Sequence, residues 1–97
     1  MSIRTVERQL RRTSEQIVNL RAELVLLDEQ FAHFSDEAET ARIYALVSET
    51  PISERTHQRA ARHADVISRQ RKELVDRLTQ LEGQQDSLLD RITGGLN

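Results

Sequence analysis

The chain contains no cysteine or tryptophan, one proline, three glycines and three aromatic residues among its 97 residues. Without cysteine, the sequence excludes disulfide bonds, thiolate metal sites and cysteine nucleophiles. The shortage of aromatic, glycine and proline residues argues against sheets and tight turns, whereas the abundant Leu, Glu, Gln, Arg and Ala favour helix. We therefore expect one all-α domain over residues 1–97, which buries only about two-thirds of the surface of its unfolded chain.

Long apolar runs are also missing from the sequence. The first six residues lack the uninterrupted apolar segment of a secretion signal, and no segment approaches the roughly 20 apolar residues of a membrane span. We therefore expect a cytoplasmic protein that does not associate with membranes. Lysine is rare as well, since Lys72 is the single lysine among 14 basic residues. This preference for arginine indicates a GC-rich, bacterial genome.

Two segments carry apolar residues at alternating spacings of three and four, which is the spacing of the a and d positions of a coiled coil. The first segment covers about 3–34, and the second covers about 52–93. Their apolar residues are Ile3, Val6, Leu10, Ile17, Leu20, Leu24, Leu27, Phe31 and Phe34, then Ala60, Ala64, Ile67, Leu74, Leu78, Leu81, Leu88 and Ile92. Two amphipathic helices of similar length follow, which predicts a long helical hairpin with a coiled-coil seam.

The segment after the first stripe contains a signal for a helix start. Ser35 is followed by Asp36 and Glu37, as in an N-cap with acidic residues in the first turn. This pattern predicts a short helix over about 36–47. The alternative is that the first helix continues through this segment, because small side chains there keep the heptad register: Ala38, Ala41 and Ala45.

The bend between the two long helices is predicted at about 48–51. Thr50 resembles an N-cap, and Pro51 follows it at the first helical position, where the missing N–H of proline costs nothing. Glu54 lies in the same first turn. At the other end, the glycine pair at 94–95 is typical of a helix C-terminus.

Charged residues favour an antiparallel arrangement of the two helices. The first twelve residues carry four arginines and one glutamate, whereas residues 73–91 carry five acidic residues and two arginines. Acidic residues of 28–49 likewise oppose basic residues of 55–72 across the bend. We expect these clusters to neutralise each other. They select the orientation more than they add stability, because a surface ion pair contributes only about 0–1 kcal/mol.

Several apolar residues lie outside the predicted seam and predict self-association. Two helices alone bury a single seam, so these side chains need a further cover, and a homodimer that forms a four-helix bundle is the simplest one. A different, larger protein is the main alternative partner. The predicted self-association residues are Val18, Val25, Leu26, Val66, Val75 and Leu89.

Polar residues at two a positions of the second stripe are expected to fix the register of the helix pair. These residues are Arg71 and Gln85, and a polar group inside a heptad seam usually specifies register at some cost in stability. We expect Arg71 to keep its aliphatic stem in the seam and to reach a carboxylate such as Asp28.

The sequence contains no recognisable catalytic machinery. Nucleophile–base pairs, glycine-rich phosphate loops and buried carboxylate pairs are missing, so neither an enzyme, a cofactor nor a small-molecule substrate is expected. The three histidines, His33, His57 and His63, fall near the bend but lack the spacing of a metal site. The basic clusters have no interleaved aromatic residues and the net charge is −2, so nucleic-acid binding is not expected either.

The bend end is the most suggestive region for binding a partner. Its candidate residues are Asp36, Glu37, Glu39, Ile43, Leu46 and Val47. A coiled-coil finger with carboxylates near its tip resembles the N-terminal domain of the Gre-type transcript-cleavage factors, which enter the secondary channel of RNA polymerase. The resemblance covers the shape and the charge cluster, and it implies a transcription accessory factor that acts through an acidic tip.

The sequence thus predicts, in first place, a non-enzymatic interaction module that acts as an adaptor or regulator of a larger protein assembly. A transcription accessory factor with an acidic coiled-coil tip is the first alternative. A helical protein that binds nucleic acid is the second, and this class would show a steep dependence of its affinity on salt.

Overall fold

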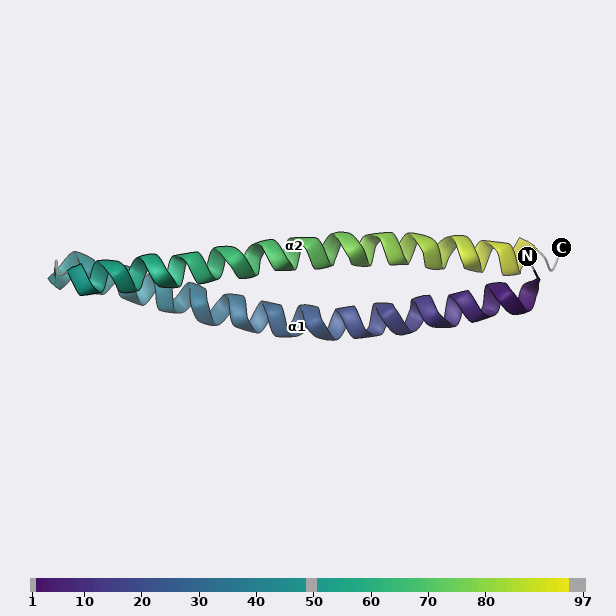
Figure 1. Ribbon diagram of the computed structural model, residues 1–97, viewed down its shortest axis with the longest axis horizontal. Coiled ribbons are helices and arrows are strands. Elements are labelled where there is room, and N and C mark those ends of the chain that lie inside the picture. The colour runs from purple at the N-terminus through teal and green to yellow at the C-terminus, as the bar shows by residue number, and fades with distance from the viewer. Residues whose placement is uncertain (1, 49–50, 95–97) are drawn as a thin grey trace. The chain divides into compact units, whose positions relative to one another are not determined.

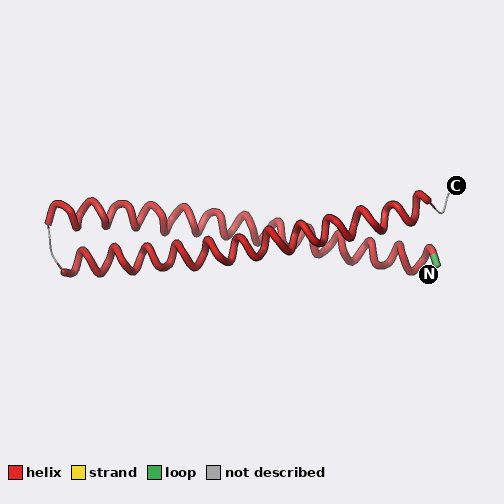
Figure 2. Tube along the Cα trace, turned by 90° about the horizontal axis from the view of Figure 1, so that it is seen from above, coloured by secondary structure: helices red, strands yellow, loops and turns green. Residues whose placement is uncertain are grey.

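The computed structural model describes residues 2–48 and 51–94, which form two helices, α1 (Ile3–Ser48) and α2 (Pro51–Gly94) (Figure 1). Every described residue except Ser2 is helical, and these ranges contain no strand (Figure 2). The predicted all-α helical hairpin is confirmed. In the described ranges, neither helix has a stretch apolar and long enough to cross a membrane. The predicted cap Thr50 and the glycine Gly95 lie outside the described residues.

The starts of both helices follow from local sequence. Ser2 precedes α1, and its hydroxyl oxygen accepts a hydrogen bond from the backbone N–H of Thr5 at 3.3 Å. Its carbonyl accepts one from the backbone N–H of Val6 at 3.1 Å. Ser2 thus satisfies two donors at the helix N-terminus. α2 begins at Pro51, the predicted first helical position, with Glu54 in its first turn.

The predicted break near Ser35 does not occur. α1 continues to Ser48, so a separate helix over about 36–47 is wrong, and the alternative of a continuous first helix is what the structure shows. The physical reason is that the heptad pattern continues, and packing of the seam residues outweighs a local cap signal. The seam positions beyond Ser35 are all buried or half-buried: Ala38, Ala41 and Ala45.

The described chain divides into two units. Among the described residues, the terminal unit consists of 2–24 and 74–94, and the bend unit consists of 25–48 and 51–73. In both units, residues later in α1 contact residues earlier in α2. The helices are therefore antiparallel within each unit. These contacts are Ser14–Gln85 and Arg21–Glu82 in the terminal unit, and Asp28–Arg71 and Ala38–His57 in the bend unit.

The core of the terminal unit is built from large aliphatic residues of the predicted seam. Leu81 is 1% exposed and forms a buried cluster with Ile17 and Leu78. Three half-buried leucines pack against this cluster: Leu20, Leu24 and Leu74. Val6, Thr13 and Leu88 are also buried. Ile3, the first residue of the stripe, is exposed, because it lies at the end of the helix.

The seam of the bend unit is built largely from small residues. Among the described side chains of this unit, the fully buried apolar ones are Ala41 and Ala60. Phe34 is half-buried, whereas Phe31 is exposed although it belongs to the predicted stripe, because a single facing helix does not cover a whole phenyl ring. An alanine buries far less apolar surface than a leucine, so this seam supplies less stabilisation than the leucine cluster.

Polar and aromatic contacts supplement the alanine seam. Arg71 Nε donates to Asp28 Oδ1 at 2.5 Å, as predicted for a seam arginine. His57 Nδ1 lies 3.2 Å from the carbonyl oxygen of Ala38. The ring of Phe34 meets two histidine rings edge to face, with centroid distances of 5.2 Å and 5.0 Å to His33 and His63. The three histidines therefore gather in one part of the bend unit.

Candidate functional site

The last two turns of α1 and the first turn of α2 carry five large apolar side chains that face solvent. We call them the bend cluster: Ile43, Tyr44, Leu46, Val47 and Ile52, which are between 51% and 80% exposed. On α1, residues 43, 46 and 47 have i, i+3 and i+4 spacing, so their side chains are neighbours on the helix surface. Residues 44 and 47 are neighbours for the same reason. The α1 part of the bend cluster is therefore one continuous apolar surface.

The same stretch of α1 shows an inverted distribution of apolar residues. Its inner positions, 38, 41 and 45, are alanines that are buried or half-buried. Its outer positions carry isoleucine, tyrosine, leucine and valine. A helix that serves only to close a hairpin places its larger apolar residues inside and its polar residues outside. This inversion leaves an apolar outer face exposed to solvent, beside a seam of small residues.

Sequence reasoning found three members of the bend cluster and missed two. Ile43, Leu46 and Val47 were predicted as partner-binding residues and are exposed, as such a role requires. Tyr44 and Ile52 were missed. A signal for Tyr44 was present, because its spacing of three from Val47 puts both on one helix face. The position of Ile52 directly after Pro51 gave no such signal.

The predicted acidic residues lie on the flank of α1 and not at its end. Asp36, Glu37 and Glu39 precede the last residue of α1, Ser48, by 9 to 12 positions, which corresponds to roughly three turns. All three are exposed. Because α1 is continuous here, these carboxylates do not open a helix, and the apolar bend cluster lies closer to the bend than they do.

Two of the three acidic residues already have partners on α1. Glu39 accepts hydrogen bonds from Arg42 at 2.6 Å and 3.1 Å. The Arg42 guanidinium holds the pKa of Glu39 below its usual value, and Glu39 in turn raises the pKa of Arg42. Glu37 lies 3.7 Å from His33 Nε2. The guanidinium of Arg42 thus offsets the negative charge of Glu39, and the carboxylate of Glu37 lies beside an imidazole ring.

The residues predicted for self-association are divided between the two units. Val18, Val75 and Leu89 belong to the terminal unit, and Val25, Leu26 and Val66 belong to the bend unit. Five of the six are exposed, and Val75 is half-buried. Their exposure agrees with the prediction that they lie outside the seam.

The expected neutralisation of the N-terminal arginines is not found. Within the described residues, no ion pair involves the arginines at 4, 8, 11 or 12. The terminal unit instead shows one pair across the seam, Arg21 with Glu82 at 3.5 Å. The heptad register gives the reason. Arg21 and Glu82 are at e positions beside the seam, where interhelical pairs form, whereas the four arginines are at b, c and f positions on the outside.

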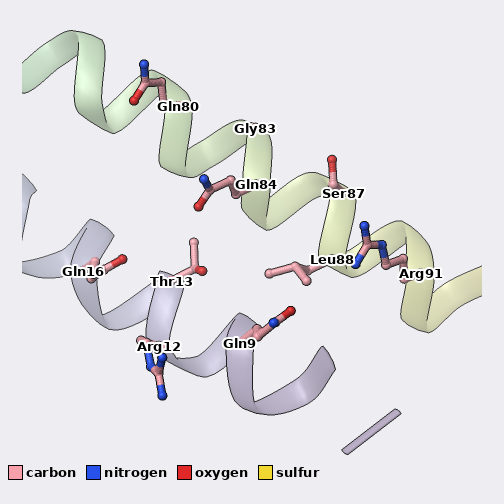
Figure 3. A pocket seen from close by; sticks show the side chains of 10 residues that line it. All are labelled: Gln9, Arg12, Thr13, Gln16, Gln80, Gly83, Gln84, Ser87, Leu88 and Arg91. Atoms are coloured by element: carbon pink, nitrogen blue, oxygen red, sulfur yellow. The ribbon is translucent and has the colours of Figure 1, made fainter. Parts of the chain in front are cut away.

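A groove of about 770 Å³ runs over another part of the terminal unit (Figure 3). Its lining is rich in amide and guanidinium groups, and it consists of Gln9, Arg12, Thr13, Gln16, Gln80, Gly83, Gln84, Ser87, Leu88 and Arg91. Figure 3 shows Thr13 and Leu88 pointing into the space between the helices. The groove combines hydrogen-bond donors and acceptors with apolar surface. Sequence reasoning missed it, although Gln9 and Gln16 share one heptad position.

Gly83 lines this groove on α2 and contributes no side chain to it. A Cβ atom placed on this residue would meet no atom within 4 Å, so no close approach requires a glycine here. We therefore expect Gly83→Ala to raise the free energy of unfolding by about 0.5–1 kcal/mol, because alanine is the better helix former. A urea denaturation curve measures this change. A decrease in stability would show that the position needs glycine after all.

The described residues do not assemble a metal site. In residues 2–48 and 51–94, no three His, Cys, Asp or Glu side chains lie together so that they could hold a metal ion. The histidines near Phe34 make ring contacts and one contact to a backbone carbonyl oxygen. Their arrangement therefore supports the packing of the bend unit.

Comparisons of the chain with protein-family models, with curated proteins and with solved structures gave no match. The surfaces described above therefore carry the functional argument.

Proposed function

We propose that this protein is a non-enzymatic interaction module that binds a larger protein through its bend cluster. The supporting observation is the inverted end of α1, with alanines at the seam and large apolar side chains on the outer face. Exposing these side chains to water is unfavourable, and burying one fully is worth about 1.5–3 kcal/mol. A partner surface supplies that burial.

The spacing of the bend cluster fits recognition of a helix in a groove. Ile43, Leu46 and Val47 have the i, i+3 and i+4 pattern with which an amphipathic helix enters an apolar groove of a partner. Tyr44 adds an aromatic ring with a hydroxyl group, a residue type that often carries much of the binding energy of an interface. The partner is therefore expected to present an apolar groove with a polar rim.

The double substitution Leu46→Asp and Val47→Asp tests this proposal. It places two charges on the apolar face, and we expect partner affinity to fall by about 30-fold or more, which corresponds to about 2 kcal/mol. Helix content should not change, because both side chains are exposed. The measurement is affinity capture from cells with quantitative mass spectrometry, and circular dichroism reports helix content.

A matched variant separates the apolar surface from the acidic one. In the triple substitution Asp36→Ala, Glu37→Ala and Glu39→Ala, the bend cluster remains intact, so this variant should capture the same partner as the wild type. If instead the triple variant loses the partner and the double variant keeps it, recognition depends on the carboxylates, as in the transcription-factor alternative. If both variants still capture the partner, this result contradicts a binding role for this end of the chain.

A further inference from the structure

The groove of the terminal unit continues into a smaller hollow on the same side of the two helices. The hollow has a volume of about 190 Å³, and it is lined by Gln16, Asn19, Leu20, Arg77 and Leu81. It shares Gln16 with the groove. Apart from Gly83, every lining residue of the groove and the hollow is at a d, g or c position of its helix. We call this side of the terminal unit the groove flank.

Charged residues are distributed unequally around the terminal unit. Its described residues, 2–24 and 74–94, contain seven acidic residues and seven arginines. None of these acidic residues lines the groove or the hollow. Three of the arginines do: Arg12, Arg77 and Arg91. The lining therefore contains positive groups without a negative one.

The guanidinium groups of the groove flank are available to a ligand. Within the described residues, none of the three arginines forms an ion pair. Arg77 makes one long hydrogen bond, to Gln80 Oε1 at 3.4 Å. The acidic residue of the unit that shares a g position is Glu23, one heptad beyond Gln16 on α1. Positive charge thus exceeds negative charge on this flank, although the whole chain has a net charge of −2.

The lining of the groove flank suits a ligand that carries carboxylates. A guanidinium group donates two parallel hydrogen bonds to one carboxylate. Five amide side chains add further donors: Gln9, Gln16, Asn19, Gln80 and Gln84. Proteins that bind single-stranded nucleic acid stack its bases on aromatic side chains, and no aromatic residue lines this part of the described chain. An acidic protein segment therefore fits this surface better than a nucleic acid does.

The donors of the groove flank repeat with the spacing of a helix. On α2, Arg77, Gln84 and Arg91 follow one another at seven-residue intervals, and on α1, Gln9 and Gln16 do the same. Seven residues rise about 10.5 Å along a helix. A further helix presents the same face again after that distance, whereas a strand does so after about 6.7 Å. A helix with acidic residues along one face therefore matches this row of donors.

We propose that the groove flank binds an acidic amphipathic helix of another protein, which lies beside α1 and α2 as a third helix. Its carboxylates meet the guanidinium groups of Arg77 and Arg91. Its apolar side chains cover Leu88 and the aliphatic stems of the glutamines in the lining. Gly83 contributes no side chain, so the backbone of the bound helix can approach α2 closely here. This surface belongs to a different unit from the bend cluster, so each of the two proposals can fail without the other.

Two designed peptides test this proposal. Each peptide contains about 21 residues in three heptads with leucine at the a and d positions, and it carries either glutamate or lysine at the e and g positions. Fluorescence anisotropy of the labelled peptides at low salt measures their dissociation constants. The wild type is expected to bind the acidic peptide at least about 10-fold more tightly than the basic one. The net charge of −2 favours the opposite order, so this preference reports a local positive surface.

Charge reversal in the chain locates the contact. Arg77→Glu with Arg91→Glu should reverse the preference in favour of the basic peptide, because the acidic peptide then meets like charges. Arg4→Glu with Arg11→Glu makes the same change in net charge at two b positions of α1, away from the groove flank. This matched variant should still prefer the acidic peptide. Circular dichroism checks that both variants keep the helix content of the wild type.

Four results would overturn the proposal. The first is equal binding of the two peptides by the wild type, and the second is an equal effect of the two arginine variants, which would assign the preference to net charge. The third is loss of the acidic peptide in Leu46→Asp with Val47→Asp, which would place the peptide on the bend cluster. The fourth is displacement of the acidic peptide by a single-stranded oligonucleotide of about 20 nucleotides, which would assign the groove flank to nucleic acid.

Discussion

Leu81→Ala is expected to lower the free energy of unfolding by about 2–5 kcal/mol. Leu81 is 1% exposed and lies in the buried cluster with Ile17 and Leu78. Its truncation removes apolar contacts and leaves a cavity between two helices, which can close around it only in part. Because the stability of a domain is usually about 5–15 kcal/mol, this loss is a large fraction of the total.

Urea denaturation followed by circular dichroism measures the effect of Leu81→Ala. Protein concentration must be held constant, because association shifts apparent stability. Leu46→Ala is the matched control, since it removes the same atoms from an exposed position and should change stability by less than about 0.5 kcal/mol. Equal effects of the two substitutions would contradict the assignment of Leu81 to the core.

Asp36→Pro is expected to cost about 3 kcal/mol or more, because α1 is continuous at this position. Proline in a helix interior removes one backbone hydrogen bond, and its ring clashes with the carbonyl four residues earlier. The outcome differs sharply if a separate helix begins after Ser35. Residue 36 would then be the first helical position, where proline is favourable.

Asp36→Ala controls for loss of the side chain. Asp36 is exposed, and alanine is a better helix former, so this variant should be at least as stable as the wild type. Thermal unfolding of both variants gives the comparison. A proline variant that melts together with the alanine variant would show that the helix is interrupted near residue 35.

The positions of the seam were predictable from the sequence. Heptad spacing identified the a and d positions of both helices, and most of the predicted apolar residues are buried or half-buried. The contact of Arg71 with Asp28 was also predictable, because a long basic side chain at a seam position reaches a carboxylate at its edge. Both inferences depend on periodicity, which helical geometry fixes locally.

The course of α1 past Ser35 was not decided by the sequence. A serine followed by acidic residues occurs both at helix starts and inside helices, so the local signal alone is ambiguous. The register of Ala38 and Ala41 decided between the two alternatives, and it depends on packing against a distant part of the chain. Tertiary contacts outweighed local preference here.

The distribution of charge along the helices predicted their orientation correctly, but it did not predict which residues form ion pairs. The antiparallel arrangement is found in both units, yet the four arginines of the first twelve residues make no ion pair in the described residues. Pair formation depends on the heptad position of each side chain and not on its segment.

The alanines of its seam are expected to lower the free energy of local unfolding in the bend unit. Regions with few buried apolar contacts open with a small free energy, whereas well-packed regions exchange their amide hydrogens only when the whole domain unfolds. Ala41 and Ala60 lose little when their helices separate, and Leu81 loses much. We therefore expect the helices of the bend unit to separate locally at a lower free energy than those around the leucine cluster.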